Sequence, residues 1–181
     1  GNITYKIKSD ADKKLDAPTE IPNQIDYTRS FNNVQGNAFF SAKWFLNKNQ
    51  DVTQLLAENQ YKFHAIPAAV PNFKKLVFDV PRVTSIVKNK TELVLSLQST
   101  RHPVRYVILY GTESNVLIDS EDPSHIIDKF YVQKNNNRLS IRIPFSAIEN
   151  KSNFALSYID YYGNESKEII TQLPKSVLKT N

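Results

Sequence analysis

The residues best suited to chemistry in this sequence form one short run of aromatic and polar side chains. The run contains Phe40, Ser41, Lys43 and Trp44, and Trp44 is the only tryptophan of the chain. An aromatic ring can stack on the apolar face of a sugar, while a hydroxyl and an amine can bind its polar edge. Tyr5 lies near the end of an earlier predicted strand. We therefore expect either a carbohydrate contact at these residues or, as the alternative, packing of Trp44 in a core or between domains.

Carboxylates could supply acid-base chemistry or bind a cation, but their spacing favours neither role. Three of them lie among lysines in one loop, a pattern typical of a solvated segment: Asp10, Asp12 and Asp16. Three others lie within four positions and could offer oxygen ligands to calcium: Asp119, Glu121 and Asp122. No Asp-x-Asp-x-Asp-Gly pattern accompanies this second group. We therefore expect no catalytic residue and no metal ligand in either group.

Residues needed for other common reactions are absent or scattered. Cysteine is absent, which excludes disulfides, thiolate catalysis and cysteine metal sites. The three histidines, His64, His102 and His125, have no partner nearby in the sequence for a shared metal site. No Gly-x-Ser-x-Gly motif, phosphate-binding loop or dinucleotide fingerprint is present. The sequence therefore predicts no cofactor and specifies no reaction.

Composition indicates a folded protein with a diffuse positive charge. The chain has 181 residues, 40% of them hydrophobic, which is enough to bury a core in one domain or in two small ones. The net charge of +5 comes from 23 basic and 18 acidic residues without a basic run interleaved with aromatics. Nucleic acid is therefore not an expected partner. No signal peptide and no apolar stretch of about 20 residues is present. Because the chain begins at Gly1, we expect a processed protein or a fragment of a longer one.

Residues 1–70 are predicted to form a βαβα segment that positions the candidate residues. Ile3–Ile7 alternates apolar and polar side chains, as a strand does. A helix is expected over Glu20–Arg29, with Thr19 as its N-cap. The apolar run Val34–Phe40 predicts a strand buried on both faces, and an apolar stripe beginning near Asp51 predicts a second helix.

A second domain is predicted over residues 75–174, after a linker at Ala65–Pro71 that contains two prolines. Short segments with alternating side chains follow one another here: Leu93–Leu97, Tyr106–Tyr110, Leu139–Ile143 and Phe154–Tyr158. Asparagine and glycine residues mark turns between them, as at Tyr162-Gly163-Asn164. Several short strands separated by turns favour an antiparallel β-sandwich.

A set of short motifs follows one another along the chain in a consistent order. They are Glu20-Ile21 and Gln24-Ile25 before Arg29, Val34-Gln35-Gly36, Phe39-Phe40-Ser41-Ala42-Lys43, Leu55, Tyr61, Phe154–Asp160 and Gly163-Asn164-Glu165-Ser166. Their order and spacing resemble those of the C-terminal third of the glycosyl-hydrolase-10-like lipoproteins, a bacterial family. The resemblance implies the end of a (β/α)8 barrel followed by a fibronectin type III-like sandwich.

Under this resemblance, Ile3–Ile7 and Val34–Phe40 would be the seventh and eighth barrel strands. The expected fold class is thus an α+β chain in two parts, a barrel remnant and an antiparallel immunoglobulin- or fibronectin III-like β-sandwich. A barrel site is assembled from the loops of all eight strands, and glycoside hydrolysis usually needs two facing carboxylates. The chain alone is therefore not expected to be catalytic.

Two functions stay open from the sequence. In the first, the chain is the C-terminal fragment of a glycoside hydrolase acting in polysaccharide metabolism, with an accessory sandwich and no activity of its own. In the second, it is a non-catalytic carbohydrate- or protein-binding module of an exported protein. The resemblance also implies a periplasmic or membrane-anchored lipoprotein, attached to the membrane only through a lipid upstream of this chain. A glycan is the expected partner, and the oligomeric state is open.

Overall fold

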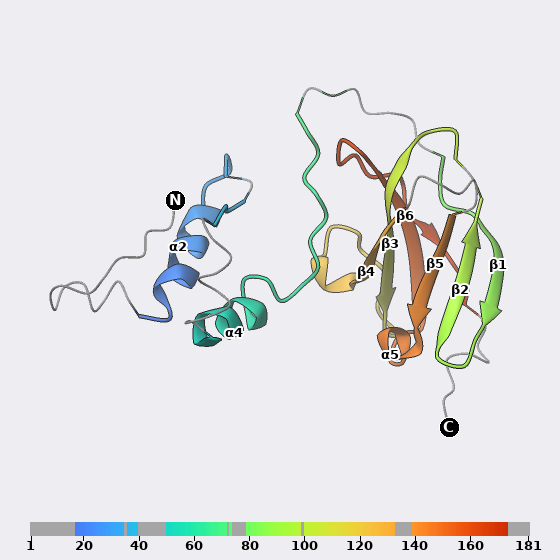
Figure 1. The fold of residues 1–181 in the computed structure, drawn as a ribbon, viewed down its shortest axis with the longest axis horizontal. Coiled ribbons are helices and arrows are strands. Elements are labelled where there is room, and N and C mark those ends of the chain that lie inside the picture. The colour runs from blue at the N-terminus through green and yellow to red at the C-terminus, as the bar shows by residue number, and fades with distance from the viewer. Residues whose placement is uncertain are drawn as a thin grey trace, which may run out of the picture. The chain divides into compact units, whose positions relative to one another are not determined.

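The computed structural model describes residues 17–34, 36–39, 50–71, 73, 79–98, 100–132 and 139–173 (Figure 1). The chain divides into two compact units, Gly1–Lys62 and Phe63–Asn181, and each has its own buried core. Helices and two antiparallel sheets make this an α+β chain, as predicted at that level. The predicted strand Ile3–Ile7 lies outside the described residues.

The first unit contains helix α2, Glu20–Arg29, and helix α4, Gln50–Glu58. Both helices lie where the apolar periodicity predicts them, because a stripe repeating every 3.6 residues is stable only as a helix with one buried face. The two stripes meet in one cluster, formed by Ile21, Ile25, Val52, Leu56 and the partly buried Phe39. This small core holds the helix pair together.

The start of α2 differs from the prediction in one respect. Thr19 precedes the helix, but its side chain makes no capping hydrogen bond. Its backbone already has helical angles, φ −82° and ψ −11°, whereas a side-chain cap requires a more extended residue. Glu20 lies in the first turn as predicted and accepts a hydrogen bond from Gln24 Nε2 at 2.9 Å.

The strand predicted over Val34–Phe40 is wrong for the residues described there. None of them forms a strand, and Val34, Gly36 and Ala38 are exposed instead of buried on both faces. A strand needs a neighbour to pair its backbone groups, and the described part of this unit offers none. The Val34 amide instead donates to Phe31 O at 3.0 Å within a local turn. The barrel remnant thus gains no support from this unit.

The second unit is an antiparallel β-sandwich (Figure 1). One sheet has the strand order β1-β2-β5 and the other has the order β4-β3-β6-β7. The strands are β1 Val83–Lys88, β2 Glu92–Leu97, β3 Val104–Thr112, β4 Ile126–Tyr131, β5 Leu139–Pro144, β6 Asn153–Asp160 and β7 Ile169–Ile170. A 3-10 helix, η1 Pro123–His125, precedes β4, and a short helix, α5 Phe145–Ile148, follows β5. The chain passes from one sheet to the other after β2, β4 and β5.

The predicted alternation is confirmed in the strands that line the core between the sheets. β2 buries Leu93, Leu95 and Leu97, and β5 buries every second residue while exposing Ser140 and Arg142. The opposite sheet contributes Val104, Val107, Leu109, Phe154, Leu156 and Tyr158 to the same cluster. Successive side chains of a strand point to opposite faces, so one face of each sheet fills this core.

The outer face of the four-stranded sheet is buried as well. β6 is buried along almost its whole length, on both of its faces. Its residues Ala155 and Ile159 belong to a second cluster together with Ile108, Tyr110 and Ile126. Ile66, which precedes the sandwich in the sequence, packs against this cluster. The sheet is therefore the middle layer of the unit.

Residues 65–71, here named the covering segment, lie on that outer face. The sequence predicts a linker here, but the segment belongs to the second unit and is bound to it. The Val70 amide donates to Tyr162 O at 2.7 Å, and Lys129 Nζ donates to Ala65 O at 3.0 Å. The carbonyl of Ala68 lies against Gly163, whose φ is +80°. Its prolines prevent regular strand pairing, yet its backbone still forms hydrogen bonds with the rest of the unit, one through the Ala65 carbonyl and one through the Val70 amide.

Candidate recognition surface

The candidate residues named by the sequence, Tyr5, Phe40, Ser41, Lys43 and Trp44, all lie outside the described residues. Their role in carbohydrate contact therefore stays a prediction. A site on the described part of the chain must be built from other residues. The second unit offers two candidates, an acidic loop between β3 and β4 and a tyrosine-rich region on the outer side of its four-stranded sheet.

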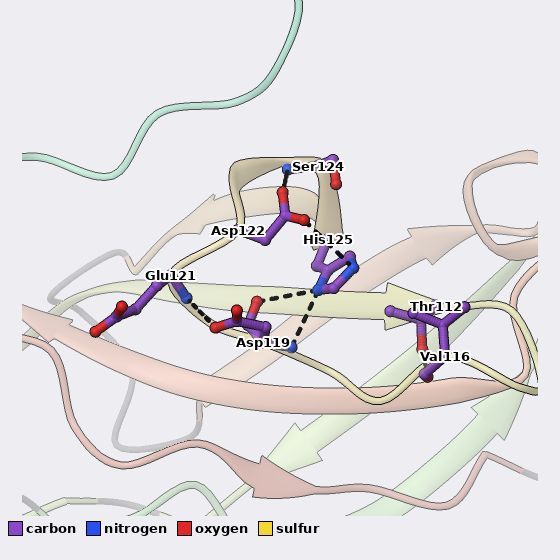
Figure 2. Close-up of polar contacts among 7 residues, drawn as sticks. All are labelled: Thr112, Val116, Asp119, Glu121, Asp122, Ser124 and His125. Carbon is purple, nitrogen blue, oxygen red and sulfur yellow. Dashed lines mark hydrogen bonds and ion pairs between the residues drawn. The ribbon is translucent and has the colours of Figure 1, made fainter.

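Figure 2 shows that the acidic loop binds its own backbone. Asp119 Oδ1 accepts a hydrogen bond from the Glu121 amide at 2.9 Å, and Asp122 Oδ1 accepts one from the Ser124 amide at 2.8 Å. The His125 ring lies between the two aspartates, with Nδ1 3.0 Å from Asp119 N and Nε2 3.7 Å from Asp122 Oδ2. Hydrogen bonds from Ser124 lower the pKa of the exposed Asp122 carboxyl. The loop is therefore stabilised from within.

The described residues of the acidic loop form no metal-binding group. One oxygen of Asp119 and one of Asp122 each close a local turn with a following amide, as aspartate side chains commonly do. Within the described ranges, no group of three or more histidine and acidic side chains could hold a metal ion. The calcium alternative for Asp119, Glu121 and Asp122 accordingly has no geometric support.

The second candidate is a set of aromatic and cationic side chains, named here the tyrosine-cation surface. It consists of Arg105, Tyr106, Lys129, Tyr131 and Tyr161. Tyr106 lies at its centre, with the Tyr131 ring 5.8 Å away in an edge-on arrangement. The Arg105 guanidinium lies 5.4 Å from the centre of the Tyr106 ring and 5.9 Å from that of Tyr161. Lys129 Nζ lies 5.2 Å from the centre of the Tyr106 ring, so one ring contacts two cations.

Strand register brings these residues together. Tyr106 on β3 pairs directly with Tyr131 on β4, and Lys129 on β4 pairs with Ile108 two residues further along β3. Because side chains alternate between faces, Tyr106 and Ile108 share one face with Tyr131 and Lys129. Tyr161 directly follows β6, the other neighbour of β3. The surface therefore extends across three adjacent strands of one sheet.

Exposure and charge distinguish this region from the buried parts of the sheet. The side chains of Tyr131 and Tyr161 are 60% and 38% exposed, while Tyr106 is half-buried. No carboxylate in the described part of the chain forms an ion pair with Arg105 or Lys129. Flat apolar rings beside positive charges can bind a ligand that has an apolar face and polar or anionic edges.

Sequence reasoning misses this surface although it notes Tyr106. The segment Ile126–Tyr131 does not alternate regularly between apolar and polar residues. In the structure most of its side chains are half-buried on either face of the sheet, so neither face requires one type of residue. The signal that could have found the surface is the density of tyrosine at strand ends, at Tyr131, Tyr161 and Tyr162. The register that brings Tyr131 beside Tyr106 depends on long-range pairing, which a local pattern does not contain.

Two further tyrosines are buried and have a structural role. Tyr110 donates to Glu165 Oε1 at 2.5 Å, and the Ser157 hydroxyl donates to the same oxygen. Burial, followed by the nearby Glu165 carboxylate, raises the pKa of Tyr110 well above its ordinary value. Burial also raises the pKa of Tyr158 to about 12, with a smaller effect of Asp79 in the same direction.

These pKa shifts predict that a phenol of the folded protein ionises late in an alkaline titration. Tyrosine in the unfolded chain ionises near pH 10, whereas Tyr158 in the folded protein ionises near pH 12. The unfolded chain releases this proton first, so Tyr158 contributes its full stability below pH 10 and loses it as the pH rises towards 12. Near-ultraviolet absorbance should resolve the step near pH 12, and Tyr158→Phe should reduce its amplitude. A single step near pH 10 in folded protein, as judged by circular dichroism, would contradict this assignment.

Comparison with known proteins identifies no relative of this chain. A scan against models of protein families finds no match, and searches among curated proteins and solved structures find no similar protein either. In the described ranges no helix is both long and apolar enough to cross a membrane.

Proposed function

We propose that this chain is the non-catalytic, glycan-recognising part of a longer exported protein that acts on polysaccharide. The β-sandwich carries the recognition in this proposal, and the tyrosine-cation surface is the observation that supports it. Exported placement, as a periplasmic or lipid-anchored protein, belongs to the same proposal and rests on the resemblance to the glycosyl-hydrolase-10-like lipoproteins.

The chemistry of the tyrosine-cation surface supports a sugar ligand. A pyranose ring has an apolar face of C–H groups, which an exposed tyrosine ring such as that of Tyr131 can cover. The phenol hydroxyls and the two cations at the margin can bind the hydroxyls of the sugar. Tyr131 lies on β4, and Tyr161 directly follows β6. Because the sheet already orders both residues, little side-chain and backbone freedom is lost on binding.

The arrangement of the carboxylates supports a non-catalytic role. Hydrolysis of a glycoside usually needs two carboxylates facing each other across the bond. The buried Asp160 accepts hydrogen bonds from the Tyr162 and Asn164 amides at 2.8 Å each, and Glu165 accepts from Tyr110 and Ser157. Asp160 and the loop aspartates thus hold turns, while Glu165 binds side chains of β3 and β6.

The strand order supports a fibronectin type III-like assignment of the sandwich. In immunoglobulin constant domains the fourth strand lies in the sheet of the first, second and fifth strands. Here the fourth strand, β4, joins β3, β6 and β7 instead. That division agrees with the accessory sandwich that the resemblance implies, and the fold by itself does not specify a ligand.

The test is calorimetric binding of plant and host polysaccharide fragments to the chain and to a Tyr131→Ala variant. We expect at least a tenfold loss of affinity, about 1.4 kcal/mol, because an aromatic ring that covers the face of a ligand behaves as a hot spot. Tyr27→Ala is the matched control, since Tyr27 is 68% exposed but lies on α2 of the first unit.

Three results would count against this assignment. Absence of binding to every glycan, or an equal loss in the Tyr27→Ala control, would overturn it. A loss in a Trp44→Ala variant combined with none in Tyr131→Ala would move recognition to the first unit. That result would support the sequence-based prediction for Trp44, Ser41 and Lys43 in its place.

A further inference from the structure

We infer that the tyrosine-cation surface selects acidic glycans, those built from sugars that bear a carboxylate, over neutral ones. This inference deepens the proposed function and rests on it. Aromatic rings alone would bind neutral and acidic chains similarly, so selectivity must come from Arg105 and Lys129.

Arg105 is positioned to bind a carboxylate. Its guanidinium lies near the rings of Tyr106 and Tyr161, and the N–H groups of this guanidinium donate no hydrogen bond to any residue that the structure describes. Ring contacts leave the N–H groups of a guanidinium free to donate, and its planar fork matches the two oxygens of a carboxylate. A uronic acid residue stacked on a neighbouring tyrosine would bring its carboxylate to this fork.

Lys129 provides a second positive charge whose position is fixed. Its Nζ donates to Ala65 O of the covering segment at 3.0 Å, while the ammonium group has three donors in total. The remaining donors are available to a ligand beside the Tyr106 ring. The covering segment therefore helps to place the charge as well as to bury the sheet.

The acidic residues nearest in sequence do not neutralise these two cations. Asp128 precedes Lys129 on β4 and so points to the opposite face of the sheet, and its Oδ1 accepts from the Lys129 amide at 2.7 Å. Asp160 precedes Tyr161 and is buried in hydrogen bonds to the following turn. Glu165 lies on the same face, but its carboxylate accepts hydrogen bonds from Tyr110 and Ser157 and forms no ion pair with either cation. Arg105 and Lys129 thus keep donors that an anionic ligand can bind.

The experiment compares hexagalacturonate with cellohexaose, a neutral chain of equal length, by calorimetry on the full chain. We expect the acidic hexamer to bind at least tenfold more tightly, and its affinity to fall as salt is raised. Arg105→Gln should weaken the acidic hexamer about tenfold and leave the neutral one unchanged. Arg105→Lys should lose part of the affinity but keep the salt dependence, because charge is retained without the fork.

Arg142→Gln is the control for net charge. Arg142 lies on β5 of the other sheet and pairs with Glu92, so its removal changes the charge by the same amount away from the rings. Thermal unfolding of each variant verifies that the fold is retained. An equal loss of affinity for hexagalacturonate in Arg142→Gln would overturn the inference. Binding of an oligothymidylate of equal charge with the same affinity as hexagalacturonate would also overturn it, because charge alone would then explain binding.

The outcomes separate this inference from the proposed function. If both hexamers bind equally and both require Tyr131, the surface recognises glycans without selecting acidic ones, and only the inference fails. If neither hexamer nor any other glycan binds, the proposed function fails with it. Tighter binding of the acidic hexamer that depends on Arg105 and on Tyr131 supports both.

Discussion

Replacing Leu156 by alanine should lower the free energy of unfolding of the sandwich by about 3 kcal/mol, within the range of 2 to 5 kcal/mol typical of such changes. Leu156 is 0% exposed and lies on β6, where it pairs with Leu109 on one side and Ile169 on the other. Truncation removes apolar contacts and leaves a cavity between two sheets that are both held by backbone pairing. Urea denaturation followed by circular dichroism measures the loss.

Leu117→Ala is the matched control for this prediction. Leu117 belongs to the same unit and is 90% exposed, so the same truncation should change the free energy of unfolding by less than about 0.5 kcal/mol. Similar small losses in both variants would mean that the two sheets do not enclose a tightly packed core.

The second large effect is expected at Gly163, where alanine should cost about 3 kcal/mol. Gly163 has φ +80°, a conformation that costs other residues roughly 1–2 kcal/mol. A Cβ added there would lie 2.5 Å from Ala68 O and 2.9 Å from Ala68 C, which are backbone atoms of the covering segment. The clash adds about 1–3 kcal/mol, as overpacking does elsewhere. Urea denaturation measures the loss of stability, and limited proteolysis reports whether the covering segment is displaced.

Two variants distinguish the causes at Gly163. Asparagine tolerates positive φ but carries the same Cβ, so Gly163→Asn should recover only the conformational part of the loss. Gly111→Ala is the control within the sandwich, since its new Cβ would meet mainly the side-chain end of Ile127. A loss at Gly163 no larger than that at Gly111 would show that the covering segment is not held in place by this contact.

Local periodicity predicts the elements whose burial follows one simple rule. Helix α2 has the predicted bounds because Ile21 and Ile25 recur at helical spacing. Strands β2 and β5 alternate cleanly because one face of their sheet is buried and the other is not. In such elements the sequence pattern and the tertiary environment carry the same information.

Prediction of secondary structure fails where a run of apolar residues packs without forming a strand. The run beginning at Val34 is rich in aromatics, but Phe39 contributes to a helix-pair cluster in the absence of any described neighbouring strand. The prolines of Ala65–Pro71 indicate irregular backbone correctly, yet irregular backbone can be packed as tightly as a strand. Whether it packs depends on Ile66 finding an apolar sheet face, which is not visible locally.

The candidate site is still less accessible to sequence reasoning. Tyr106 and Tyr131 lie 5.8 Å apart only because β3 and β4 pair in one register, and a shift of one residue would place Tyr131 on the other face. Arg105 and Lys129 are individually ordinary surface cations in the sequence. Their lack of carboxylate partners in the described structure is a property of the folded unit.

The covering segment also constrains the order in which the second unit folds. Lys129 and Ala65 lie 64 residues apart in the sequence, and the contacts of Val70 and Ala68 with the turn at Tyr162 and Gly163 are more distant still. Closing such loops costs chain entropy before any contact compensates for it. We therefore expect the sheet to assemble before the segment docks. During that interval the apolar cluster that Ile66 packs against would be more exposed, and newly made chains would associate through it.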